Sequence, residues 1–325
     1  MPKLLITSLT VPNGEDPVLT QLRNAGWQIE FSPYRPDRTD TELAEVICGA
    51  DAVVAGTDPF TERAFAGADR LKLIARVGVG HDAIDTEAAT RRGIAVTITV
   101  GVNNDAVADF AMTLIMALGR QLLPNHESVR TGGWKRDIGT DIWGKTIGII
   151  GTGLIGRGVA RRAHGFNMRI LARDLYPDAS IQEQYGARYV ELDELLQASD
   201  FVTLHVTLNP HTRHMIGARQ FALMKPSAYI VNTCRGPVID EAAMIDALQT
   251  GGIAGAGLDV FEREPPMRSP LLTLPNVVLA PHVAGISQES QRGMADMAYA
   301  EVLRLARNEP FLHAVNQAGL GQTTR

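Results

Sequence analysis

The chain has 325 residues, 45% of them hydrophobic and 21% charged, with a formal net charge of −5. This length exceeds what one hydrophobic core usually serves, so we expect two domains. The acidic balance disfavours a nucleic-acid partner, and no apolar run approaches the roughly 20 residues that cross a bilayer. Cys48 and Cys234 form neither a disulfide framework nor a metal-binding cluster. With an N-terminus unlike a signal peptide, these features predict a cytoplasmic protein that binds no metal, membrane or nucleic acid.

The first hundred residues alternate short apolar runs with helical patterns. We expect buried parallel strands over residues 3–8, 28–32, 51–55, 71–75 and 94–97. A long helix rich in Ala, Leu and Met follows over 103–120, and its apolar stripe is expected to pack against another domain or subunit. The polar segment 121–141, with Trp134 and Trp143 in or near it, predicts an arm that wraps a partner. The alternative is a surface loop with both tryptophans tucked in.

Residues 146–156, TIGIIGTGLIG, combine a β-branched run with three glycines in G-x-G-x-x-G spacing, and a helical pattern follows over 157–164. Gly151 permits a tight turn, Gly153 leaves room for a pyrophosphate, and Gly156 lets the helix pack close to the strand. The helix N-terminus offers unpaired N–H groups to the phosphates. A strand, a glycine turn and a helix in this order predict a dinucleotide site.

A second strand, expected over 168–172, ends at Arg173 and Asp174. Asp174 lies 23 residues after Gly151, where such sites carry a carboxylate for the adenosine ribose. Because this carboxylate repels a 2′-phosphate, we expect NAD rather than NADP. The neighbouring Arg173 keeps NADP open as the weaker alternative, since a guanidinium accommodates a phosphate.

Further strands are expected to end at residues 206, 232, 259 and 280, with helices between them. Strands that alternate with helices form right-handed crossovers and a doubly wound parallel sheet, so the expected fold class is α/β. His205, near the end of one strand, is expected to hydrogen-bond within the sheet edge. A last helix over 288–306 makes the first domain discontinuous if it returns to that domain.

Four polar residues follow strands of the expected second sheet: Arg235, Asp259, Glu264 and His282. Ligands of open parallel sheets bind beyond the carboxyl ends of the strands, where these residues gather. Arg grips a carboxylate with two parallel hydrogen bonds, and His delivers a proton to a carbonyl oxygen as a hydride reaches its carbon. A carboxylate beside an imidazole favours its protonated form. Beside a dinucleotide, this set predicts hydride transfer to a 2-oxo acid.

Each of these residues also has a plainer interpretation. His282 is then a structural histidine, Glu264 a solvated loop acid and Asp259 the cap of a turn. Arg235 then forms a surface ion pair with one of the two acids that follow it, Asp240 and Glu241. The convergence of the four residues on one sheet edge favours the functional interpretation.

Five segments carry a family resemblance: LKLIARVGVGHDAIDTEAATRRGIAV, GKTIGIIGTGLIG, VNTCRGPVIDE, GLDVFEREPP and APHVAG. In this order they resemble the D-isomer-specific 2-hydroxyacid dehydrogenase family over nearly the whole chain. The resemblance implies a Rossmann-type doubly wound parallel sheet inserted into a flavodoxin-like substrate domain. The NAD-binding Rossmann domain is then 103–284, and the substrate domain is 1–102 plus 285–325. The resemblance further implies an NAD-dependent dehydrogenase of small D-2-hydroxy acids that forms a homodimer.

The resemblance also implies roles for single residues. His282 is then the acid–base group, Glu264 its partner and Arg235 the anchor of the substrate carboxylate or carbonyl, while Asp259 orients the nicotinamide amide. The family's cofactor positions correspond to Val107, Gly151, Gly153, Leu154, Ile155, Gly156, Asp174, Val206, Thr207, Thr212, Thr233, Cys234, Arg235, Asp259, His282 and Gly285. Its substrate positions correspond to Arg76, Val77, Gly78, Val79, Gly80, Asn103, Arg235 and His282. The loop 76–80 is then an anion-binding nest of backbone N–H groups.

The motifs look most like those of D-3-phosphoglycerate dehydrogenases, in which an Arg at the position of Arg76 meets a phosphate. We therefore expect a short phosphoglycerate dehydrogenase, without the C-terminal regulatory domain that many of them carry. A glyoxylate or hydroxypyruvate reductase is the close alternative. An NADH-binding corepressor is an alternative of another class, since such proteins keep the Arg, Glu and His. Formate dehydrogenases resemble this fold but carry Gln at the position of Glu264, so that activity is the least favoured.

Overall fold

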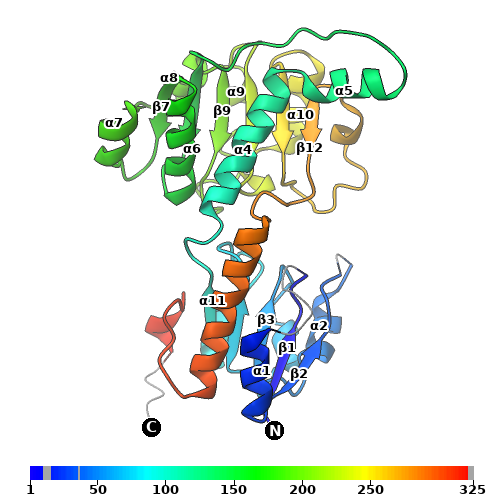
Figure 1. Cartoon of the computed structure of the whole chain (residues 1–325), viewed down its shortest axis with the longest axis vertical. Helices are drawn as coiled ribbons and strands as arrows, with labels where there is room; N and C mark the ends of the chain where they lie inside the picture. The colour runs from blue at the N-terminus through cyan, green and yellow to red at the C-terminus, as the bar shows by residue number, and fades with distance from the viewer. Residues whose placement is uncertain (10–15, 36, 321–325) are drawn as a thin grey trace. The chain divides into compact units, whose positions relative to one another are not determined.

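The computed structural model describes residues 1–9, 16–35 and 37–320 and shows an α/β protein with two parallel sheets (Figure 1). The chain divides into two compact units, which we call the first unit, Met1–Asn103 with Ile286–Arg325, and the second unit, Asn104–Gly285. The second unit begins and ends one residue later than the expected domain 103–284. The first unit is discontinuous in sequence, because the last helix belongs to it.

The sheet of the first unit has five parallel strands in the order β2-β1-β3-β4-β5. They are β1 (Lys3–Ile6), β2 (Gln28–Phe31), β3 (Ala52–Ala55), β4 (Leu73–Arg76) and β5 (Ala95–Ile98). All five expected strands are present, with ends that differ by at most two residues. β3, β4 and β5 are buried along their whole length, which explains their continuous apolar runs.

Helices cover both faces of this sheet. One face carries α1 (Pro17–Asn24) and α11 (Gln288–Ala306), and the other carries α2 (Asp40–Val46), the 3₁₀ turn η1 (Ala64–Gly67) and α3 (Thr86–Arg91). α11 spans the residues expected for the last helix. Its N-cap is Ser287, whose hydroxyl accepts from the Ser290 N–H, and it buries Met294, Ala298 and Val302 in the core.

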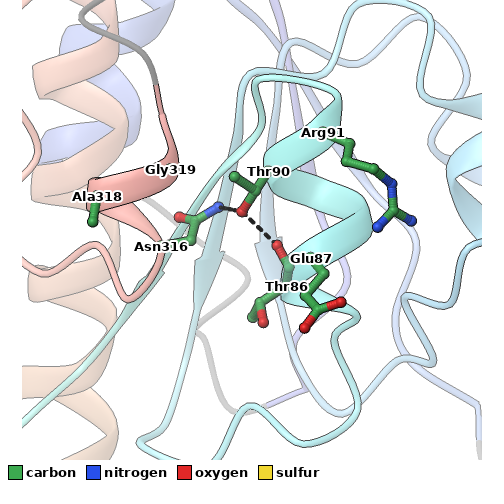
Figure 2. A pocket seen from close by; sticks show the side chains of 7 residues that line it. All are labelled: Thr86, Glu87, Thr90, Arg91, Asn316, Ala318 and Gly319. Carbon is green, nitrogen blue, oxygen red and sulfur yellow. Dashed lines mark hydrogen bonds between the residues drawn. The ribbon is translucent and has the colours of Figure 1, made fainter.

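After α11 the chain runs back along the edge strand β5. The Ile98 N–H donates to the His313 carbonyl at 3.2 Å, and the Val315 N–H donates to the Val96 carbonyl at 2.9 Å. A cavity of about 350 Å³ lies between α3 and the 3₁₀ turn η4 (Gln317–Gly319). Figure 2 shows the residues that line it: Thr86, Glu87, Thr90, Arg91, Asn316, Ala318 and Gly319. None of them is among the residues expected to bind substrate or cofactor.

The second unit has seven parallel strands in the order β12-β11-β10-β9-β6-β7-β8. They are β6 (Thr146–Ile150), β7 (Arg169–Arg173), β8 (Arg188–Tyr189), β9 (Phe201–Leu204), β10 (Tyr229–Asn232), β11 (Gly255–Leu258) and β12 (Val277–Leu279). The strand order reverses at β6, which lies between β7 and β9. Ligands of such sheets bind at the carboxyl ends of the strands beside this reversal. The edge strand β8 was not expected, because two residues are too few to show a period.

Helices also cover both faces of the second sheet. α4 (Asn104–Gly119) and α6 (Leu154–Gly165) lie side by side on one face (Figure 1). The other helical elements are α7 (Ala179–Tyr185), α8 (Leu192–Ala198), α9 (Ala218–Phe221), α10 (Glu241–Gln249) and the 3₁₀ turns η2 (Gly236–Val238) and η3 (Pro270–Thr273). α6 begins three residues before the expected start, because the glycine turn itself supplies its N-cap, Gly153.

The segment expected to form an arm contains a helix, α5 (Leu122–Arg130), that the sequence pattern did not reveal. None of its residues is buried, so it has no apolar period to recognise. Trp134, Ile138 and Trp143 are 74%, 96% and 66% exposed, so the alternative with both tryptophans tucked in is wrong for the single chain. Among the described residues no single helix is long and apolar enough to cross a membrane; α4 and α5, which meet at a 66° bend, reach that length and apolarity only together.

Candidate active site

The glycine turn between β6 and α6 forms a cradle at the reversal of strand order. Gly151 has φ +92°, and a Cβ there would collide with the His205 carbonyl. A Cβ at Gly156 would collide with the Gly151 carbonyl, whereas one at Gly153 would meet nothing within 4 Å. α6 starts at Leu154 without a side-chain cap. The first N–H groups of α6 therefore remain for an anion, and the cradle fits the pyrophosphate of a dinucleotide.

Asp174 lies directly after β7, beside this cradle. Its Oδ2 accepts from the N–H and the hydroxyl of Thr152 at 2.6 and 3.1 Å, and its Oδ1 accepts from the Tyr176 N–H at 2.9 Å. Partial burial works against the charged form, but these hydrogen bonds outweigh it and hold the pKa of the Asp174 carboxyl below its usual value. The carboxylate is thus charged and oriented beside the glycine turn.

The loops after β9 and β10 hold several expected cofactor positions. The hydroxyl of Thr212 donates to the Thr207 carbonyl at 2.7 Å and closes the loop that follows Val206. The hydroxyl of Thr233 is buried and has no hydrogen-bond partner within the described residues. It is therefore available to hydrogen-bond a bound cofactor. Burial raises the pKa of the neighbouring Cys234 thiol to about 11, so this cysteine stays protonated.

Arg235 is held by a residue that the sequence analysis did not single out. Asn232 is 1% exposed; its amide nitrogen donates to the Arg235 carbonyl at 2.9 Å and its amide oxygen accepts from the Cys234 N–H at 3.0 Å. The Arg235 guanidinium donates to the Cys234 carbonyl at 2.7 Å. A buried Asn at the end of an apolar strand is the signal that could have revealed this turn.

Glu264 and His282 lie together, as expected. His282 Nδ1 is 2.8 Å from Glu264 Oε2, and Glu264 Oε1 accepts from the Phe261 N–H at 3.1 Å. Within the described residues His282 Nε2 has no hydrogen-bond partner, and 36% of the side chain is exposed. The carboxylate therefore orients the ring and leaves Nε2 for a substrate.

Asp259 is fully buried, and its carbonyl accepts from the His282 N–H at 2.8 Å. Its two carboxylate oxygens accept from the N–H groups of Val283 and Ala284, both at 2.7 Å. It therefore does cap a turn, as the plainer interpretation held, and this turn begins at His282, which has φ +57°. Burial raises the pKa of the Asp259 carboxyl, although the two N–H donors and His282 act in the opposite direction.

The expected substrate loop 76–80 belongs to the first unit. Arg76 is 8% exposed, and its guanidinium donates to the Val77 carbonyl and covers Gly78, which has φ +137°. The Gly78 N–H donates to the Thr99 hydroxyl at 2.8 Å. In the described part of the chain the N–H groups of Val79 and Gly80 have no acceptor, so they remain for an anion.

The remaining expected positions are unevenly accessible. Asn103, in the first unit, keeps a buried side-chain oxygen without a partner among the described residues. Val107, in the second unit, is 5% exposed, whereas Leu154 is 53% exposed and Ile155 is partly exposed. Gly285 is the last residue of the second unit. The cradle, the charged Asp174 and the unpartnered Thr233 hydroxyl together fit a nicotinamide dinucleotide.

Comparison with known proteins agrees with this geometry. The model of the "D-isomer specific 2-hydroxyacid dehydrogenase, NAD binding domain" matches residues 112–284. A glyoxylate reductase of Thermococcus litoralis is 41% identical, over 97% of each chain. A D-3-phosphoglycerate dehydrogenase of Methanocaldococcus jannaschii is 42% identical over 87% of this chain but only 55% of its own length. The crystal structure of a glyoxylate reductase from Paecilomyes thermophila superimposes with a TM-score of 0.85 at 32% identity, over 98% of this chain and 99% of that one. The chain therefore belongs to the D-isomer specific 2-hydroxyacid dehydrogenase family and carries its NAD-binding domain.

Proposed function

We propose that the protein uses NADH to reduce a small 2-oxo acid without a phosphate group, with glyoxylate and hydroxypyruvate as the preferred substrates. The observation that carries this proposal is the pair Glu264–His282, joined at 2.8 Å with His282 Nε2 left for a substrate. Bound NADH supplies the hydride. His282 Nε2 donates a proton to the carbonyl oxygen as the hydride reaches C2, which gives the 2-hydroxy acid and a neutral imidazole.

The other residues bind and orient the substrate. Glu264 holds the His282 ring through Nδ1, so that Nε2 is directed to the substrate. Arg235 binds the carboxylate or the carbonyl oxygen through its guanidinium, and Asn232 holds the Arg235 backbone in place. In the first unit, the N–H groups of Val79 and Gly80 are donors suited to a carboxylate.

The choice of an unphosphorylated substrate differs from the first expectation, a phosphoglycerate dehydrogenase. That expectation relied on Arg76 as a phosphate ligand, but Arg76 is 8% exposed and donates to the Val77 carbonyl of its own loop. A cation so placed supports the loop more readily than it binds a dianion. The similarity to glyoxylate reductases along nearly the whole chain also supports the smaller substrates.

The test is NADH oxidation by the purified protein with glyoxylate, hydroxypyruvate, phosphohydroxypyruvate and pyruvate. We expect kcat/KM for glyoxylate or hydroxypyruvate to exceed that for phosphohydroxypyruvate by about tenfold or more, a difference of about 1.4 kcal/mol. A preference for phosphohydroxypyruvate would favour the phosphoglycerate dehydrogenase instead. NADH binding without turnover of any substrate would favour a corepressor-like protein.

We also infer that the protein works as a homodimer and that residues 122–143 form its contact. Leu122, Val129, Trp134, Ile138 and Trp143 are all more than half exposed in the single chain. Apolar side chains so exposed over one continuous segment mark a protein interface. Light scattering should give a dimer for the natural protein and a monomer for Ile138→Glu, while the exposed Leu312→Glu serves as control; a natural monomer would contradict the inference.

A further inference from the structure

Glu264 belongs to the segment 261–269, which follows β11 and which we call the Glu264 loop. We infer that Glu241, the first residue of α10, is a positioning residue that fastens this loop and so holds Glu264 against His282. The inference rests on the proposed roles of Glu264 and His282.

One carboxylate fastens the loop at both ends. Glu241 Oε2 accepts from the Glu262 N–H at 3.2 Å, and Glu241 Oε1 accepts from the Ser269 hydroxyl at 2.7 Å. Glu264 lies between these two points along the chain. Hydrogen bonds to a charged acceptor contribute more than neutral ones, so this double contact strongly restricts the path of the loop.

Glu241 is itself held by the start of a helix. Asp240 caps α10 by accepting from the Ala243 N–H at 3.1 Å, which sets the direction in which Glu241 leaves the helix. The partial positive charge of a helix N-terminus also stabilises a carboxylate in the first turn. The carboxylate is therefore a fixed point on the body of the second unit.

The position of the Glu264 loop determines where Glu264 lies beside His282. A Cβ at Gly236 would collide with the Phe261 carbonyl, so the loop lies directly on the turn that follows Arg235. The Phe261 N–H then donates to Glu264 Oε1 at 3.1 Å, and Glu264 Oε2 meets His282. Movement at Glu262 would thus reach Glu264 through the neighbouring backbone.

A second set of contacts also fastens the Glu264 loop, but it is weaker than the contacts of Glu241. Glu262 Oε1 lies 2.8 Å from His214 Nε2 and 3.8 Å from the Arg213 guanidinium. The His214 and Glu262 side chains are 39% and 33% exposed, so water competes with this contact. Glu241 therefore carries the main share of the positioning.

The test compares Glu241→Ala with Asp246→Ala, which removes an exposed carboxylate from the same helix. We expect Glu241→Ala to lower kcat about tenfold to a hundredfold, because small displacements of a catalytic group cost that much. KM and the Kd for NADH should change less than about twofold, because the glycine cradle and Asp174 are untouched.

Two further variants separate positioning from general folding. Glu241→Gln keeps one acceptor and should recover most of kcat, whereas Ser269→Ala removes one of the two contacts and should lose less than Glu241→Ala. If Glu241→Ala fails to fold, Ser269→Ala is compared with Asp246→Ala instead, and it should then lower kcat with NADH affinity kept. A loss of kcat no larger than that of Asp246→Ala, or an equal loss of NADH affinity, would overturn the inference.

The outcome also distinguishes this inference from the proposed function. Turnover by the natural protein with unchanged kcat in all Glu241 and Ser269 variants overturns the positioning role alone. NADH binding by the natural protein without turnover of any 2-oxo acid overturns both.

Discussion

His205 Nε2 lies 2.9 Å from the Thr203 hydroxyl, while His205 Nδ1 is buried without a hydrogen-bond partner among the described residues. The expected hydrogen bond within the sheet edge is therefore present on one nitrogen only. Burial disfavours the imidazolium and lowers the pKa of His205 to about 3. This histidine is thus neutral in the folded protein near neutral pH.

The neutral His205 predicts a loss of stability in mild acid. The unfolded chain protonates this imidazole near pH 6.5, whereas the folded protein keeps it neutral down to about pH 3. The unfolded state therefore binds one more proton in this window, and the free energy of unfolding falls by about 1.4 kcal/mol per pH unit as the pH drops below about 6. Urea unfolding between pH 7 and pH 4.5 should show a flatter dependence for His205→Gln. Parallel curves for the two proteins would contradict the prediction.

His282→Ala should abolish most turnover but leave cofactor binding intact. The proton donor is lost, and general acid catalysis contributes about 10²- to 10⁴-fold, so kcat should fall within that range. The Kd for NADH, measured by fluorescence, should stay within about twofold, because the glycine cradle is unchanged. His211→Ala is the matched control, since this histidine is exposed. Near-full turnover by His282→Ala would exclude His282 as the acid.

Asp174→Ala should shift the cofactor preference toward NADP. The charged carboxylate repels a 2′-phosphate by about 1–4 kcal/mol at close range, so its removal should raise the ratio of kcat/KM for NADPH over NADH about tenfold or more. Glu183→Ala is the control, because Glu183 is an exposed carboxylate of the same unit. An unchanged ratio in Asp174→Ala would mean that another residue contacts the ribose.

Tyr299→Phe should leave the protein as stable as before or more stable by about 1 kcal/mol. Tyr299 is fully buried in the core of the first unit, and its hydroxyl has no hydrogen-bond partner in the part of the chain that the structure describes. A buried hydroxyl without a partner costs about 1–3 kcal/mol of desolvation, which Phe avoids at nearly the same shape. Thermal unfolding checks this. A loss of stability above 1 kcal/mol would show that the hydroxyl does have a partner.

Local patterns in the sequence were sufficient for most of the second unit. Gly151, Gly153 and Gly156 predicted the turn between β6 and α6 by their spacing. Two of the reasons are local, since Gly151 has φ +92° and a Cβ at Gly156 would collide with the Gly151 carbonyl. Buried parallel strands were recognisable because both faces of each strand are apolar. α5 and β8 escaped prediction, since a helix without buried residues and a two-residue strand leave no periodic pattern.

The sequence by itself determined which polar residues stand at the ends of strands, and therefore the edge at which Arg235, Glu264 and His282 gather. Only the tertiary structure decided which of them touch, because those contacts join residues far apart in the chain. Glu264 meets His282 across 18 positions, and Glu241 meets Ser269 across 28. The path of the Glu264 loop depends on its packing against Gly236. The residues of the loop carry no sequence pattern that reveals this contact. Hydrophobic periodicity reports on residues that are close in sequence. A hydrogen bond between distant loops forms only after the sheet has brought the ends of those loops together.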